Sequence, residues 1–184
     1  QVVKWTIDNR PYRIHGIAVN NCENSADFGN LYMTESIRDV SGLNTRYSWL
    51  SGKIPSLLEY SPQLDYLDFH KNNFNDMDPH RVRVSKDGRI FVTSHAWQAS
   101  TAVWEYKNGT FKSVITGLPA DKRVMSIDTK GSKDDLKLLV FYLDKTYTNT
   151  TGEGMYCYEY SLGTKESITY NSGIEKAHLQ DFTT

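Results

Sequence analysis

Short runs of alternating apolar and polar residues, separated by turn residues, recur along the chain. The clearest runs from Val103 to Tyr106, where Val103 and Glu105 alternate with two aromatic residues. This is the two-residue period of a strand in a half-buried sheet. A helical period fits none of these runs over a useful length. The pattern therefore predicts an all-β fold built from short strands.

The predicted strands fall into three units of four strands each. In the second unit, the turn from Ser85 to Gly88 follows the first strand, and Asn108-Gly109 joins the third strand to the fourth. Asn-Gly between alternating apolar runs is a strong hairpin signal. The units are expected at residues 12–72, 78–118 and 121–172, the last ending on a strand at 166–170, with strands at 1–8 and 174–184 belonging to flanking units.

A four-stranded unit that recurs with the same internal order predicts a β-propeller, in which each unit forms one antiparallel blade. The alternative is an antiparallel β-sandwich, whose strands have similar spacing. Blades of about 40–50 residues would give this chain about three to four blades. We expect part of a larger ring, because an open ring leaves edge strands exposed. A small ring, and a ring closed by self-association of copies, are the alternatives.

Two segments carry a resemblance to a known family. Gly16-Ile17-Ala18-Val19, followed by the segment from Gly29 to Glu35, resembles the blade opening of NHL-type and related six-bladed propellers, and Val82–Thr93 repeats it. The third unit departs from this pattern, with Lys133-Asp134-Asp135 in place of the short Asp-Gly turn. The resemblance covers about three blades and implies the propeller fold. It implies little about function, because propellers include lectins, scaffolds, hydrolases and lyases.

In a propeller, the loops from second to third strands and the connections between blades lie on one face. Long loops in a compact fold are often functional. Aromatic faces can cover the apolar patches of a sugar, while planar polar groups pair with its hydroxyls. We predict a ligand-binding face of seven loop residues and three residues at the innermost strands: Arg38, Tyr47, Trp49, His95, Trp97, Gln98 and Tyr147, with His15, His80 and Arg123. Packing of the tryptophans over blade edges, and structural roles for the histidines, are the alternatives.

The sequence has no nucleophile elbow, phosphate-binding loop or dinucleotide fingerprint. Glycoside hydrolysis would need two carboxylates at a controlled separation. The candidates are Glu35, Asp39, Asp144 and Glu153, and the sequence does not show which of them share a pocket.

We expect no cofactor. The five histidines form no zinc-binding pattern. Asn73, Asn75, Asp76 and Asp78 have oxygen-ligand spacing, but they lack the glycine and terminal glutamate of an EF-hand loop. Turn formation is the expected role of this run, and calcium binding is the alternative.

Composition and charge limit the classes of partner that the chain is expected to bind. Lys plus Arg is 21 against 22 for Asp plus Glu, a formal charge of −1, without the basic stripe of a nucleic-acid binder. No apolar run is long enough to span a bilayer. Cys22 and Cys157 lack the spacing of a zinc or redox site, and their pairing stays open.

These features predict a secreted or cell-surface binding module, without enzymatic activity, that recognises carbohydrate or another polymer through its loops. The secreted location is implied by the Asn- and Tyr-rich composition, which resembles that of bacterial surface proteins. One alternative is a propeller hydrolase or lyase acting on glycans or lactones, with a carboxylate or metal site at the channel mouth. Another is a protein–protein interaction scaffold.

Overall fold

The computed structural model describes residues 14–35, 57–70, 79–94, 103–144 and 154–179. These residues form three four-stranded antiparallel sheets, as the alternating pattern predicted, and within them the only helical turns are two short 3-10 segments, Lys133–Asp135 and Tyr170–Ser172. No helix in the described ranges is long and apolar enough to cross a membrane. The strands predicted at 1–8 lie outside the described residues.

In each sheet the strands follow one another in sequence order. The first sheet contains β1 (Ile14–Val19), β2 (Leu31–Glu35), β3 (Leu57–Tyr60) and β4 (Tyr66–His70). The second contains β5 (Pro79–Val84), β6 (Ile90–Ser94), β7 (Val103–Lys107) and β8 (Thr110–Ser113). The third contains β10 (Lys122–Lys130), β11 (Lys137–Asp144), β12 (Met155–Ser161) and β14 (Ile174–Leu179).

The predicted Asn-Gly hairpin is confirmed between β7 and β8. Asn108 and Gly109 have φ angles of 49° and 77°. Both fall in the left-handed region that a two-residue hairpin turn needs and that Asn and Gly adopt most readily. The turn therefore sets the register in which Lys107 pairs with Thr110.

The fourth strand of the third sheet is β14, not the segment 166–170 that the sequence pattern favoured. Tyr156 of β12 pairs with His178 of β14. The N–H of Ile168 donates instead to the carbonyl of Val114, at 2.8 Å. β13 (Ile168–Thr169) thereby forms a short parallel pair with β9 (Ile115–Thr116), which connects the third sheet to the end of the second.

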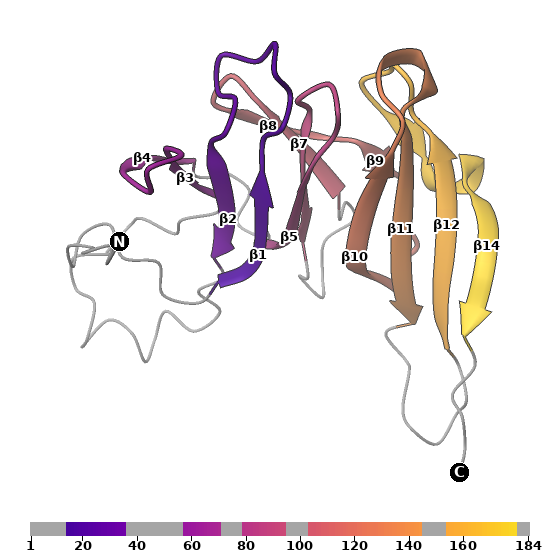
Figure 1. The fold of residues 1–184 in the computed structure, drawn as a ribbon. Helices are drawn as coiled ribbons and strands as arrows, with labels where there is room; N and C mark the ends of the chain where they lie inside the picture. The colour runs from indigo at the N-terminus through magenta and orange to yellow at the C-terminus, as the bar shows by residue number, and fades with distance from the viewer. Residues whose placement is uncertain (1–13, 36–56, 71–78, 95–102, 145–153, 180–184) are drawn as a thin grey trace, which may run out of the picture.

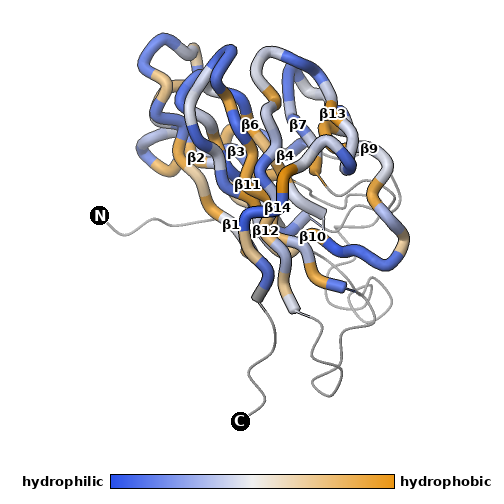
Figure 2. Tube along the Cα trace, turned by 90° about the vertical axis from the view of Figure 1, so that its right-hand side faces the viewer, coloured by the Kyte–Doolittle hydropathy of each residue, from blue (hydrophilic) through white to orange (hydrophobic). Residues whose placement is uncertain are grey.

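The three first strands, β1, β5 and β10, lie side by side in the middle of the molecule (Figure 1). From this centre the first sheet extends to one side and the third to the other, with the second sheet between and behind them (Figure 1). Hydrophobic residues are concentrated along the strands, and hydrophilic residues occupy much of the turns at the upper end (Figure 2).

The third strand of every sheet carries the same dipeptide, Glu59-Tyr60, Glu105-Tyr106 and Glu159-Tyr160. The register makes these positions equivalent, because each glutamate pairs with the same position of its second strand, occupied by Tyr32, Phe91 and Leu139. Neighbouring residues of a strand point to opposite faces. Each sheet therefore has one face that carries the glutamate, the glutamate face, and an opposite tyrosine face.

The cores lie between consecutive sheets. Between the first and second sheets, Tyr32 and Leu57 of one glutamate face cluster with residues of the next tyrosine face: Val82, Ile90, Val92, Trp104 and Phe111. Between the second and third sheets, Phe91 and Val103 cluster with a larger set that includes Val124, Ile127, Leu138, Val140, Tyr142 and Tyr160. At both junctions, therefore, a glutamate face packs against the tyrosine face of the next sheet.

Both cysteines are free and half-buried. Cys22 lies in the turn between β1 and β2, against the turn of the second sheet, where a Cβ added to Gly88 would be 3.5 Å from its Sγ. Cys157 lies in β12, opposite Phe141 on the glutamate face of the third sheet.

Candidate functional site

Each first strand has a β-bulge close to its start. The register shifts between Ile14 and Gly16 in β1, between Pro79 and Val82 in β5, and between Val124 and Ser126 in β10. Bulges re-aim side chains and are enriched beside active sites. The residues at the three shifts are His15, His80 with Arg81, and Met125. Together with Arg123 we call them the bulge edge.

The bulge edge joins three sheets by direct contacts. The rings of His15 and His80 are 5.0 Å apart between centroids. Nδ1 of His80 lies 3.3 Å from the carbonyl oxygen of Met125. Because a carbonyl only accepts, Nδ1 carries the proton, and Nε2 is the acceptor atom of the neutral ring. The Arg81 guanidinium donates to the carbonyl of His15. Side chains of one bulge therefore hold the backbone of the bulges on either side.

Two buried threonines, at equivalent positions of the second strands, form hydrogen bonds with the backbone of the second bulge. The Thr34 hydroxyl donates to the carbonyl of His80 at 2.9 Å. The Thr93 hydroxyl accepts from the backbone N–H of Arg81 at 3.0 Å. Both threonines are wholly buried. The backbone of the second bulge is thus held on both its donor and its acceptor side.

Gly16 allows β1 and β5 to approach closely at this point. A Cβ at this position would lie 2.8 Å from the backbone nitrogen of Val82 and 2.9 Å from the Cα of Arg81. Backbone atoms cannot give way as a flexible side chain can, so any larger residue would push the first two sheets apart.

An ion pair lies beside the bulge edge in the third sheet. Nζ of Lys122 bonds the Asp144 carboxylate and lies 4.6 Å from the centroid of the Tyr156 ring. The Tyr156 ring in turn stacks on His178 at 4.2 Å. Burial alone would lower the pKa of Lys122, but the hydrogen bond and charge of Asp144 outweigh it and raise that pKa. Lys122 is therefore a cation at neutral pH.

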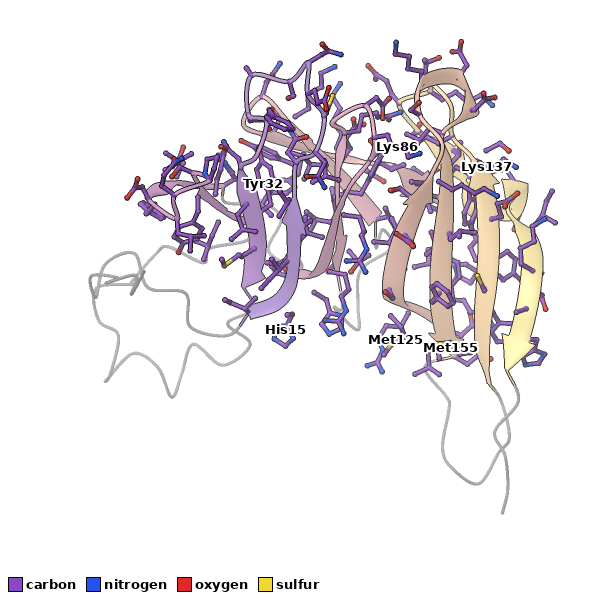
Figure 3. The ribbon with its side chains drawn as sticks, viewed as in Figure 1. His15, Tyr32, Lys86, Met125, Lys137 and Met155 are labelled. Atoms are coloured by element: carbon purple, nitrogen blue, oxygen red, sulfur yellow. The ribbon has the colours of Figure 1, made fainter. Side chains whose placement is uncertain are left out.

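Three of the ten predicted site residues are described, His15, His80 and Arg123. All three belong to the starts of the first strands, and the structure brings the two histidines into ring contact. Figure 3 shows His15 and Met125 at the same end of the sheets, opposite Lys86 and Lys137. The other seven lie outside the described residues: Arg38, Tyr47, Trp49, His95, Trp97, Gln98 and Tyr147.

The candidate carboxylates and calcium ligands are only partly covered. Asp144 is almost fully buried and engaged by Lys122. The side chains of Glu35, Asp39 and Glu153, and the whole run from Asn73 to Asp78, lie outside the described residues. Within the described ranges, no group of three or more His, Cys, Asp or Glu side chains is arranged to hold a metal ion.

Sequence reasoning missed the supporting residues of this site. Thr34 and Thr93 occupy the same place in the repeated segments Asn30–Thr34 and Arg89–Thr93. Aligning the repeats on each other would have found them. Met125 and Lys122 carry no such signal, because the third unit departs from the repeat and its bulge depends on strand pairing.

The bulge edge brings together two imidazole and two guanidinium groups, and the Lys122–Asp144 pair lies beside it. Groups of these kinds bind hydroxyls, carboxylates or other anionic oxygens where they are not already engaged within the protein, as Arg81 is by the His15 carbonyl. Comparison with known proteins adds no assignment. No protein-family model matches the chain, and no curated protein matches it significantly.

Proposed function

We propose that the chain forms part of a β-propeller binding module that recognises carbohydrate or another polymer at the bulge edge. The observation that carries this proposal is the meeting of three equivalent bulges, which places His15, His80 and Met125 in contact across three sheets. A site assembled from equivalent positions of successive repeats is what a ligand at a propeller channel requires.

The propeller arrangement is supported by the repeat of the sheets. Three meanders of four strands have their first strands side by side, and the same two faces meet at each junction. The resemblance to NHL-type propellers remains part of this proposal, as does a location outside the cytoplasm.

The two guanidinium groups of the bulge edge, those of Arg81 and Arg123, lead us to place an acidic polymer before a neutral one. Arg81 follows His80 in β5, and Arg123 lies in β10 two residues before Met125, whereas the charge of Lys122 is matched by Asp144. Second strands end, and third strands begin, at the same end of the sheets (Figure 1). The long connections that carry the predicted aromatic residues therefore leave from this end.

The test is titration with a panel of acidic and neutral polysaccharides, followed by intrinsic tryptophan fluorescence and calorimetry. We expect saturable binding of a uronic-acid polymer that weakens as salt is added, because exposed charges are screened. Replacing both His15 and His80 by alanine should weaken binding at least about tenfold, since the pair holds the centre of the edge. Chromatography of the same mixtures should show no product.

The matched control is Lys112→Ala, which removes a cation from an exposed position of β8. It should leave affinity unchanged. Binding that survives the double histidine variant would place the ligand elsewhere. Silence across the whole panel would overturn the carbohydrate assignment, and released product would show an enzyme.

A further inference from the structure

The His15 side chain lies at the bulge edge, and its ring nitrogens make no hydrogen bond to any residue that the structure describes. The ring is partly exposed and contacts the ring of His80, at 5.0 Å between centroids. The backbone carbonyl of His15 accepts from the Arg81 guanidinium. Two polar ring atoms of His15 are therefore left to meet a ligand at the centre of the proposed site.

The charged groups packed around His15 supply no counter-ion for a protonated ring. β1 packs against β2 and β5. On β5, Arg81 lies against His15, and Arg83 further along the strand pairs with Asp128 at 3.4 Å. On β2, the Glu35 side chain lies outside the described residues. Among the described side chains, the nearest charge to His15 is therefore the cation of Arg81.

The third sheet adds cations to the same edge, and its carboxylates there are already paired. β10 packs against β5 and carries Arg123 and Lys122 in its first residues. Nζ of Lys122 bonds the Asp144 carboxylate and lies 3.9 Å from that of Asp121. A proton added to His15 would therefore place one more positive charge at an edge that already holds two guanidinium groups.

An anionic ligand reverses this balance. A charged imidazole donates from both ring nitrogens, whereas the neutral ring donates from one. A carboxylate bound beside it favours the charged form. Histidine is the side chain that ordinarily changes charge between about pH 5 and pH 8. Binding of an acidic ligand and uptake of a proton would then favour each other by the same free energy.

We propose that His15 takes up a proton when the bulge edge binds an acidic polymer, so that affinity rises as the pH falls through the range in which histidine titrates. This inference rests on the proposed function and adds the way in which that binding is regulated. His80 is the second imidazole of the pair. Its Nδ1 donates to the Met125 carbonyl at 3.3 Å, so a proton that it gains goes to Nε2.

Calorimetric titration of the whole chain with a uronic-acid polymer tests the coupling. The carboxyl groups of such a polymer ionise near about pH 4, so its charge is constant between about pH 5.5 and pH 7.5. At constant ionic strength, we expect affinity to be at least about tenfold greater at the lower of these two pH values. Repeating the titration near the middle of the range, in two buffers with different enthalpies of ionisation, counts the protons taken up. We expect roughly one proton per bound site.

The variant that tests the residue is His15→Gln, which keeps a polar side chain but cannot be protonated in this range. Whatever its affinity at the higher pH, its affinity should change less with pH, and its proton uptake should fall. His178→Gln is the matched control, because His178 is an exposed histidine of β14 that stacks on Tyr156 and lies outside the pair. It should keep the pH dependence of the wild type. Circular dichroism at each pH checks that all three proteins are folded.

The outcomes separate this inference from the function on which it rests. If no acidic polymer binds at any pH, the proposed function is overturned and the coupling with it. If an acidic polymer binds with an affinity that does not depend on pH, the coupling is overturned and the binding function stands. The same holds if His15→Gln retains the full pH dependence, or if His178→Gln loses as much of it.

Discussion

The protein has two junctions between consecutive sheets, and each contains a glutamate at the same position of the third strand. The two glutamates are linked to the next sheet by different chemistry. In the first, His70 lies between Glu59, at 2.8 Å, and the Tyr106 hydroxyl, also at 2.8 Å, and its ring stacks on that of Tyr106. In the second, Arg89 holds Glu105 through two hydrogen bonds of 2.8 Å and reaches backbone carbonyls beyond.

The apolar part of the two junctions is alike, and the polar part is not. Tyr32 and Phe91 occupy equivalent places in the two cores, as do Leu57 and Val103. A repeated core needs only side chains of suitable size and shape, whereas a polar link depends on which donor the neighbouring sheet offers. The difference teaches that repeats conserve the packing of a junction while its hydrogen-bonding can vary.

The largest effect should come from removing the arginine link. Arg89→Ala leaves the Glu105 carboxylate, whose side chain is mostly buried, without its bidentate partner, at a cost of about 3 kcal/mol in the free energy of unfolding. Arg89→Lys should recover part of this, because lysine keeps the charge but loses the planar fork. Removing the histidine link by His70→Ala should cost about 1.5 kcal/mol. Chemical denaturation measures all three, and equal losses for the two alanine variants would refute the contrast.

A second comparison deletes one tyrosine hydroxyl from each junction. Tyr142 and Tyr160 are wholly buried, with their hydroxyls 2.8 Å apart. Tyr142→Phe leaves the Tyr160 hydroxyl without this partner where water has no access, and should cost about 2 kcal/mol. Tyr106→Phe also removes a hydrogen bond, but Tyr106 is only half-buried and water can replace it. That variant should cost about 0.5–1 kcal/mol, and thermal unfolding of the pair would show the order.

The smallest effect should appear in how the free energy of unfolding depends on pH under acidic conditions. The hydrogen bond from His70 lowers the pKa of Glu59 against its partial burial. A carboxyl with a lowered pKa stabilises the fold above its ordinary value of 4.5 and loses this contribution as the pH falls below it. Glu59→Gln has no such proton to gain. Its free energy of unfolding should therefore decline less steeply than that of the wild type between pH 5 and pH 3, and parallel curves would contradict the assignment.

The strands and tight turns of this fold are accessible from sequence because their signals are local. Alternation around Trp104 and the Asn108-Gly109 turn depend on neighbouring residues alone. The fourth strand of the third sheet is not accessible in this way, because Ile168-Thr169 is as suitable for a strand as Ile174–Leu179. What decides between them is tertiary, since Ile168 packs between the second and third sheets and bonds to Val114.

In the candidate site, too, some features follow from local sequence and others depend on tertiary structure. The place of His15 and His80 at the starts of first strands follows from the repeat, and so does their expected convergence. The bulges that bring them together are a property of strand pairing, in which one residue more lies on one strand than on its neighbour. Nothing local to Met125 shows that its carbonyl will meet His80.

The two free thiols make the separation of the sheets measurable in solution. Cys22 is half-buried against the turn of the second sheet, so a maleimide reagent should react with it faster when the first junction opens. A rise in its alkylation rate would then report that local opening before global unfolding. Cys157 lies in β12 of the third sheet, which takes no part in the first junction, so its labelling rate serves as an internal reference for the opening that Cys22 reports.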